Sequence, residues 1–165
     1  MPSAVTAADV VALLVRRGLT VATGESITAG LVSGSLADVP GCSAVLRGGV
    51  VAYQADVKTA LLGVAPEVVA RGIVSEAVAT AMAIGSARAL GADIGIGTTG
   101  VAGPDAHDGE PVGSVWIAVA SASGGVAEHL DLAGARADIR HAVVLACWSL
   151  VARFLGDEGI GTPGE

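Results

Sequence analysis

The chain has 165 residues, of which 52% are hydrophobic and 15% charged, a balance that excludes a disordered chain and fits one domain. Its net charge of −7 argues against nucleic acid and anionic membrane surfaces as partners. No apolar run approaches the roughly 18 residues that span a bilayer, so we expect no membrane partner.

The first hundred residues alternate between helical and strand patterns. Thr6 and Asp9 have the spacing of a capping box, and Gly18 suits the end of the helix that they begin. In chain order we predict a helix over 6–18, a strand over 19–23, a helix over 27–37, a strand over 48–53, short helices over 56–63 and 66–72, a helix over 75–90 and a strand over 92–99.

The last third of the chain has a different order. Residues 100–112 are rich in Gly, Pro and Asp and predict a loop, which at this length is long for a plain connection. Two strands, over 113–121 and 126–134, are predicted to form a hairpin that turns at Gly124-Gly125. A closing helix over 137–155 follows, and the tail over 156–165 is expected to be disordered.

This element order predicts an α/β fold. Alternating strands and helices followed by a hairpin imply a three-layer α/β/α domain over residues 1–155. Its sheet is expected to be mixed and mostly parallel, with one antiparallel member from the hairpin.

The two cysteines and the first helix bear on the compartment. Cys42 and Cys147 have neither metal-ligand spacing nor the number that a disulfide framework needs. The apolar run 10–15 lies after Asp9 and before two arginines, the reverse of a secretory signal, so we expect a cytoplasmic protein. A mean hydropathy of +0.68 favours burial of surface between copies, so we also expect a homo-oligomer.

The predicted sheet places polar residues at one edge. Ligands of such sheets bind at the carboxyl ends of parallel strands, where this chain has Gly24-Glu25-Ser26, Tyr53 and Thr98-Thr99-Gly100. Ser26, between a strand and a predicted helix, is either a helix N-cap or a nucleophile next to free backbone N–H groups.

Tyr53 is the only tyrosine and Lys58 the only lysine, although the chain has eight arginines. Lysine, unlike arginine, can lose its proton near neutral pH, so a neutral Lys58 amine could accept the proton of a serine hydroxyl. The alternative is a surface lysine with its charged head in water and a half-buried tyrosine.

Other patterns are weaker. Residues 95–100 match G-x-G-x-x-G, but the glycines lie in a strand that no helix follows, which argues against a dinucleotide site. A nucleophile-elbow hydrolase would need a histidine base, with His107, His129 and His141 as candidates. Positive charge for a phosphate could come from three arginines, of which the last two share a helix face: Arg47, Arg136 and Arg140.

Four motifs together resemble the CinA C-terminal domain family, which includes stand-alone nicotinamide mononucleotide (NMN) deamidases, over about residues 10–155. Residues 24–30 are similar to its A-E-S-x-T-G-G motif and residues 49–58 to its G-x-V-x-Y-x-x-x-x-K segment. Residues 100–105 resemble its G-[IV]-A-G-P-x loop, and residues 134–140 its G-x-R-x-x-[IV]-R stretch.

The resemblance implies an amide hydrolase that converts NMN to nicotinate mononucleotide and ammonia without a metal or other cofactor. It implies Ser26 as nucleophile, with Lys58 and Tyr53 as activating groups. Backbone N–H groups around residues 26–28 or at Gly100 would form an oxyanion hole. The residues expected to contact the substrate are Glu25, Thr28, Gly30, Arg47, Gly100, Ala102, Gly103, Pro104, Arg136 and Arg140.

The chain departs from the family motifs at four positions. Ala29 replaces a motif glycine, which matters if the backbone there needs a positive φ. Gln54-Ala55 replaces a common Ser-Asn pair, and Ala135 replaces an acid or amide. These departures leave open a second reading, in which the domain binds a nucleotide and forms oligomers without turnover.

Overall fold

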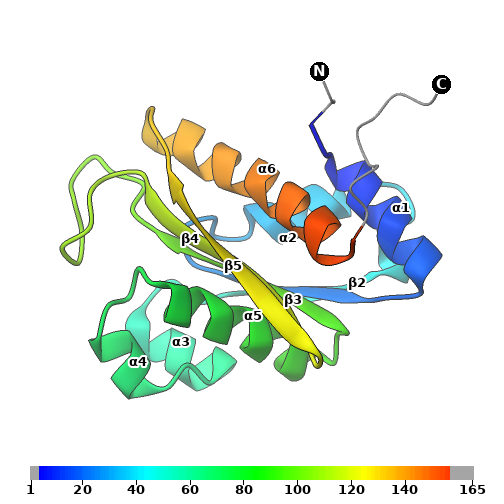
Figure 1. The fold of residues 1–165 in the computed structure, drawn as a ribbon, viewed down its shortest axis with the longest axis horizontal. Coiled ribbons are helices and arrows are strands. Elements are labelled where there is room, and N and C mark those ends of the chain that lie inside the picture. Colours follow the sequence, from blue (N-terminus) through cyan, green and yellow to red (C-terminus); the bar gives the residue numbers. More distant parts are fainter. Residues whose placement is uncertain (1–3, 157–165) are drawn as a thin grey trace.

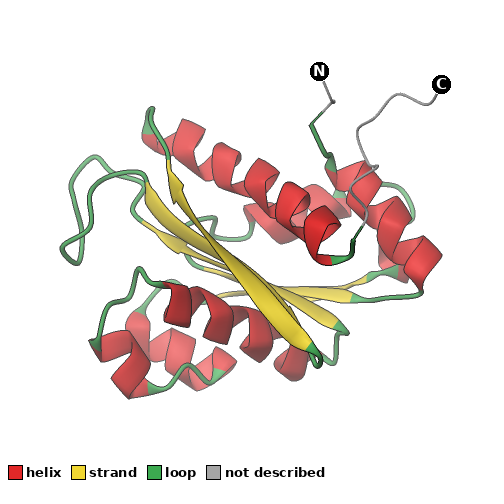
Figure 2. Ribbon diagram, in the orientation of Figure 1, coloured by secondary structure: helices red, strands yellow, loops and turns green. Residues whose placement is uncertain are grey.

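The computed structural model describes residues 4–156, which form one sheet between two helical layers (Figures 1 and 2). Apart from Gly156, the tail expected to be disordered lies outside these residues. The elements are α1 (Ala7–Arg17), β1 (Val21–Glu25), α2 (Leu31–Ala37), the 3₁₀ turn η1 (Cys42–Ala44), β2 (Leu46–Val51), α3 (Ala55–Leu62), α4 (Pro66–Ala70), α5 (Glu76–Leu90), β3 (Ile94–Gly100), β4 (Ser114–Ser121), β5 (Gly124–Asp131) and α6 (Arg136–Phe154).

The sheet has five strands in the order β2-β1-β3-β4-β5. β1 pairs in parallel with both β2 and β3, whereas β4 is antiparallel to its neighbours β3 and β5. The predicted α/β fold with a mostly parallel mixed sheet is therefore confirmed, with β4 as the single antiparallel member.

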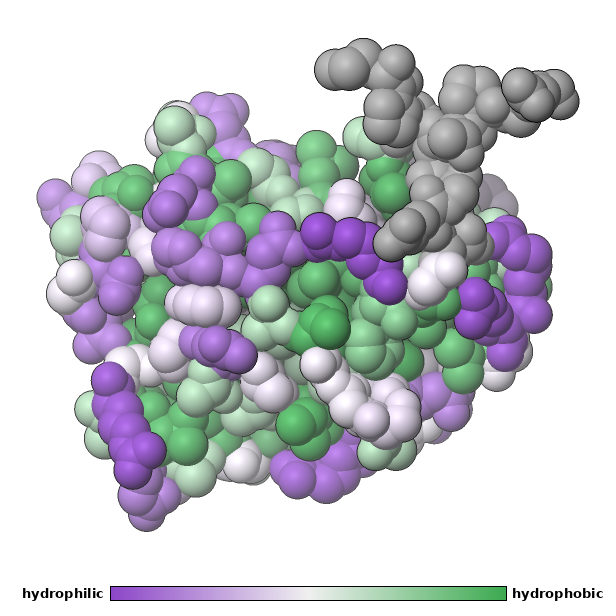
Figure 3. Space-filling model, viewed as in Figure 1, coloured by the Kyte–Doolittle hydropathy of each residue, from purple (hydrophilic) through white to green (hydrophobic). Residues whose placement is uncertain are grey.

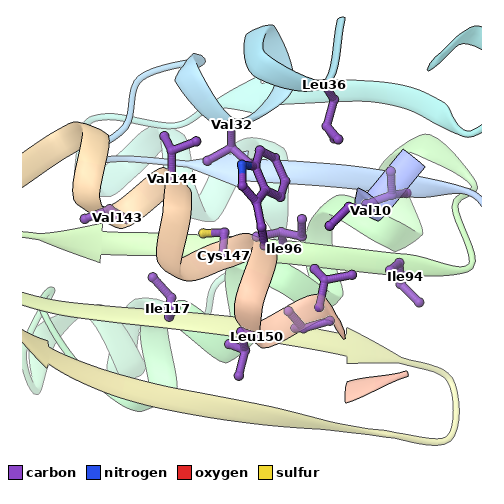
Figure 4. Close-up of a cluster of buried hydrophobic side chains, with 14 of the residues drawn as sticks. Val10, Val32, Leu36, Ile94, Ile96, Ile117, Val143, Val144, Cys147 and Leu150 are labelled. Carbon is purple, nitrogen blue, oxygen red and sulfur yellow. The ribbon is translucent and has the colours of Figure 1, made fainter. Parts of the chain in front are cut away.

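The helices divide between the two faces of the sheet. α1, α2 and α6 cover one face, and α3, α4 and α5 lie on the other (Figure 1). The larger apolar core lies under α1, α2 and α6, where Ile96 and Ile117 of the sheet face Val143 and Cys147 of α6 (Figure 4). Trp148, 1% exposed, is the largest fully buried side chain of this core.

The opposite face has almost no room between sheet and helix. A Cβ atom added to Gly95 or Gly97 of β3 would lie 1.8 Å from the Ala83 carbonyl oxygen or 2.1 Å from that of Ala79. Helix α5 thus packs its backbone directly on the central strand.

We expect Gly95→Ala to lower the free energy of unfolding by about 3 kcal/mol or more, because the new methyl group displaces α5. The matched control is Gly34→Ala within α2, where an added Cβ meets nothing within 4 Å. That change should raise stability by about 0.5–1 kcal/mol, because alanine favours a helix interior. Urea denaturation measures both, and equal midpoints for the two variants would contradict the close packing.

Two local predictions were wrong. The helix predicted from Ile27 begins at Leu31, because Ala29 and Gly30 have φ values of 44° and 97°, which a right-handed helix cannot contain. The hairpin turns at residues 122–123 and not at the two glycines, since Gly124 already pairs with Ser121.

The surface carries apolar side chains among charged ones, as the face in Figure 3 shows. The large hydrophobic residues that are exposed come from several elements: Val15, Val51, Tyr53, Leu61, Ile84, Val112, Val126 and Leu145. Within residues 4–156, none of the helices combines the length and the hydrophobicity needed to cross a bilayer.

Candidate active site

A cavity of about 400 Å³ opens at the carboxyl ends of the parallel strands, where the sequence predicted a site. Ser26 follows β1, Tyr53 follows β2 and Gly100 ends β3, and all three line this cavity. Its other walls are Ile27, Gln54, Ile73, Val74, Thr99, residues 101–107 and Arg136.

Ser26 and Lys58 are in direct contact. Lys58, on α3, is fully buried, and its Nζ donates to Ser26 Oγ at 2.9 Å. It also donates to the backbone carbonyl oxygens of Ala52 and Tyr53, each at 2.9 Å. Among the described residues no carboxylate pairs with this amine. Desolvation by burial lowers the pKa of Lys58 to about 8.

This contact bears on the two interpretations of Ser26, as an N-cap or a nucleophile, and on the two of Lys58, as a surface lysine or a proton acceptor. Ser26 does not cap a helix, since α2 begins at Leu31 and has Gly30 as its N-cap. Lys58 is not a surface lysine. None of the three histidines contacts Ser26, although His107 lines the cavity. The geometry therefore supports a serine–lysine pair and not a serine–histidine pair.

Tyr53 reaches the pair through its backbone. Its carbonyl accepts from Lys58, while its half-exposed side chain accepts a hydrogen bond from Arg136 at the hydroxyl (3.0 Å). Arg136 also donates to the carbonyl of Gly103. Arg136 thus links Tyr53 to the loop that contains Gly103.

Residues 100–104 form a further part of the cavity wall. Gly100, Ala102, Gly103 and Pro104 all line the cavity, as expected of substrate-contacting residues. Gly103 has φ 92°, a value that favours glycine, and its carbonyl is turned to Arg136.

Three other expected contacts lie behind Ser26. Glu25 is fully buried and accepts from the hydroxyls of Thr23 and Thr28 and from the N–H groups of Gly30, Val32 and Ser33. Thr28 is also within 2.9 Å of Thr98 Oγ1. None of Glu25, Thr28 and Gly30 lines the cavity. Their bonds fix the turn between β1 and α2, and the expectation that they touch substrate stays a prediction.

The three arginines that could supply positive charge lie in different places. Only Arg136 lines the cavity. Arg140 donates hydrogen bonds to the carbonyl oxygens of Ile27 and Thr28. Arg47 lies near the amino end of β2 and donates to the Leu90 carbonyl, at the opposite end of the sheet. Its distance from the strand ends corrects the expectation that it binds substrate.

Sequence reasoning missed one wall of the cavity. Ile73 and Val74, between α4 and α5, line it, and Thr99 Oγ1 donates to the Ile73 carbonyl. No local pattern marks these two apolar residues. Only the position of α5 under the sheet brings them there. Within residues 4–156, no three His, Cys, Asp or Glu side chains are placed to hold a metal ion.

Ala29 occupies the left-handed region that the family motif fills with glycine. Since its φ is 44°, we expect Ala29→Gly to raise the free energy of unfolding by about 1 kcal/mol. The control, Ala60→Gly inside α3, should lower it by a similar amount. Thermal and urea unfolding of both variants give the comparison, and a loss of stability at both positions would contradict the strain at Ala29.

Comparison with known proteins identifies related sequences and structures. A family model described as the CinA C-terminal domain matches residues 3–155. A CinA-like protein of Frankia casuarinae is 46% identical over 147 residues, which are 88% of this chain and 34% of that protein. A CinA-like protein of Gemmatimonas aurantiaca is 46% identical over 151 residues, 88% of this chain and 35% of that protein. The chain thus spans about a third of the length of these curated relatives.

Solved structures share the fold over nearly the whole chain. The competence/damage inducible protein CihA from Agrobacterium tumefaciens is 32% identical, with a TM-score of 0.86 over 91% of this chain and 93% of that one. A CinA superfamily protein from Klebsiella pneumoniae is 29% identical, with a TM-score of 0.88 over 91% of this chain and 95% of that one.

Proposed function

The chain belongs to the CinA C-terminal domain family, and we propose that it is an amide hydrolase that converts NMN to nicotinate mononucleotide and ammonia. The observation that carries the proposal is the 2.9 Å contact between Ser26 Oγ and the buried Lys58 Nζ at the wall of a cavity. A serine beside a lysine with a lowered pKa is the arrangement that activates a nucleophile. The resemblance to NMN deamidases supplies the substrate.

The two backbone carbonyls orient the lysine for this task. A neutral amine has two N–H groups and one lone pair. The carbonyls of Ala52 and Tyr53 are placed to accept the two N–H groups, which leaves the lone pair for the Ser26 hydroxyl. Burial without a carboxylate partner favours the neutral form, because an ammonium ion loses its hydration there.

The steps follow from this contact. Ser26 Oγ attacks the carboxamide carbon of NMN while its proton moves to Lys58 Nζ. The tetrahedral intermediate collapses when its C–N bond breaks, and Lys58 returns the proton to the departing NH₂ group, which leaves as ammonia. Water then attacks the acyl-enzyme with Lys58 again as base, which releases nicotinate mononucleotide and restores Ser26. Since Lys58 touches Ser26, the proton needs no relay through the Tyr53 hydroxyl.

Arg136 is the residue we assign to the substrate phosphate. A guanidinium has five N–H donors, and Arg136 directs only two bonds, to Tyr53 and Gly103. The remaining donors are available to an anion beside the cavity. In this assignment Tyr53 holds both the arginine, through its hydroxyl, and the lysine, through its carbonyl.

The test is incubation of chelator-treated protein with NMN, with ammonia and nicotinate mononucleotide followed by chromatography. Formation of both products at equal rates is expected, and it would also establish that the reaction needs no metal. Tight binding of NMN by calorimetry without ammonia would favour the nucleotide-binding module instead. Light scattering of the same sample tests the homo-oligomer, which stays a prediction.

A further inference from the structure

The turn that follows Ser26 leaves two backbone N–H groups without an acceptor. The Ser26 carbonyl accepts from Ala29 N, and the Thr28 carbonyl from Leu31 N, so residues 26–31 make a tight turn. The N–H of Ser26 itself is used, since it donates to the carbonyl of Thr98. Within residues 4–156, the N–H groups of Ile27 and Thr28 have no hydrogen-bond partner.

Arg140 fixes the direction of the peptide group that carries the Thr28 N–H. It donates to the Ile27 carbonyl through Nε at 3.0 Å and to the Thr28 carbonyl at 3.1 Å. In a trans peptide the C=O and the N–H that follows it point in opposite directions. The bond to the Ile27 carbonyl therefore turns the Thr28 N–H away from Arg140. Arg140 itself does not line the cavity.

We propose that the Ile27 and Thr28 N–H groups form the oxyanion hole of the serine–lysine site. Arg140 is the positioning residue for the Thr28 N–H, and the bond from Ala29 N to the Ser26 carbonyl holds the peptide that carries the Ile27 N–H. This inference rests on the proposed amide hydrolysis. The two groups follow the nucleophile directly in the chain, and Ile27 lines the cavity beside Ser26. When Ser26 Oγ bonds to the carboxamide carbon, negative charge develops on the carbonyl oxygen, next to these donors.

Glu25 supports the same turn from the other side. Its buried carboxylate accepts the N–H groups of Gly30, Val32 and Ser33 and so satisfies the donors that follow the proposed hole. Glu25 and Arg140 together occupy the neighbouring donors and acceptors of the turn. The unpaired N–H groups that remain in it are those of Ile27 and Thr28.

A backbone N–H can be removed by replacing its amide with an ester, and this chain is suited to that experiment. Gly41-Cys42 is a junction for native chemical ligation, so residues 1–41 can be synthesised with an ester at 27 or 28 and joined to recombinant 42–165. The all-amide ligated chain is the reference. An ester at Ala8, whose N–H lies in the first turn of α1 away from the cavity, is the matched control.

The primary readout does not depend on NMN. It is the rate at which p-nitrophenyl acetate acetylates Ser26, followed by p-nitrophenol release and by the mass of the peptide that contains Ser26. Each ester at 27 or 28 should slow this acylation by about 10²-fold, while the Ala8 ester leaves it unchanged. Rates within about threefold of the reference for both esters would overturn the proposal.

The same samples separate this inference from the proposed substrate. An all-amide chain that reacts with the activated ester but releases no ammonia from NMN would refute NMN as substrate and leave the oxyanion hole testable. An all-amide chain that is not acylated at all would overturn both. Circular dichroism and thermal unfolding establish that each ligated chain has refolded.

Arg140 is tested by a cycle with the Thr28 ester. Arg140→Ala, made in the recombinant segment, should slow acylation about tenfold without raising the KM for NMN. In the chain that already carries the ester at 28, it should have little further effect, because the group it positions is absent. A raised KM with unchanged acylation would instead make Arg140 a substrate contact, and additive losses would make it merely structural.

Discussion

Ser26→Ala is expected to lower the rate of ammonia release from NMN by a factor on the order of 10⁴ or more, because no covalent intermediate can then form. Ser26 Oγ makes its one side-chain contact with Lys58, so its removal should leave the fold intact. Thermal unfolding checks that point. The activity is measured as ammonia and nicotinate mononucleotide formed per mole of protein.

Ser35→Ala is the matched control for this variant. Ser35 lies in α2 close to Ser26 in the chain, but its hydroxyl donates to the Leu31 carbonyl and does not reach the cavity. We expect its activity to equal that of the unaltered protein. Full activity in Ser26→Ala would exclude the serine mechanism, even if the protein proves to be an NMN deamidase.

The sequence located the site but not the direction of its side chains. The positions of Ser26, Tyr53 and Gly100 followed from one rule, because the carboxyl ends of parallel strands meet at one edge of a sheet. The role of Ser26 could not be read locally, since an N-cap and a nucleophile occupy the same place in a strand–turn–helix pattern. The contact with Lys58, 32 residues further along the chain, is what supports the proposed nucleophile.

Charge alone did not predict which groups Glu25, Arg47 and Arg140 bond to. Each is charged and lies near a motif, but a carboxylate or guanidinium can satisfy the backbone as well as bind a ligand. Glu25 and Arg140 bond to the turn after β1, and Arg47 to the end of α5. Which use prevails depends on where neighbouring N–H and C=O groups point, and that is set by tertiary packing.

The backbone at Ala29 shows what a motif adds to such reasoning. A glycine in the family motif raised the question of a positive φ, and the structure has φ 44° at this alanine. The start of α2 was misplaced for the same reason, since composition alone does not reveal that residues 29 and 30 leave the right-handed region. The hairpin error has a similar origin, because Gly124-Gly125 is a turn signal that here belongs to β5.

The pH dependence of the reaction should report the ionisation of Lys58. In the proposed mechanism the neutral amine is the active form, and the pKa of Lys58 is lowered to about 8. Below that value the neutral fraction falls tenfold per pH unit, so kcat/KM should rise with pH at unit slope and level off above about pH 8. Measuring kcat/KM at about ten pH values between pH 6 and 10 gives the rising limb of the profile. A profile that is flat through pH 8 would exclude a titrating lysine base.

Lys58→Arg should lower kcat by about 10³-fold and abolish this limb, because a guanidinium keeps its proton throughout the range. Loss of activity alone could come from a distorted site, so rescue is the stricter test. The rescue variant combines Lys58→Cys with Cys42→Ser and is alkylated with bromoethylamine while unfolded. After refolding, position 58 again carries an amine at the end of a side chain as long as that of lysine. Unfolding also exposes Cys147, so bromoethylamine alkylates it as well. Because Cys147 is buried in the folded core, a control protein with Lys58 intact receives the same alkylation and shows its effect on folding and activity.

The rescued protein also tests the mechanism through its pH profile. The sulfur in the new side chain withdraws electrons and makes the amine a weaker base, so its limb should move to lower pH. A base acts through its own pKa, whereas a cation that only holds Ser26 in place does not. Rescue with a shifted limb would therefore assign proton transfer to position 58, and rescue with an unshifted limb would assign the titration to another group and leave the amine a positioning role.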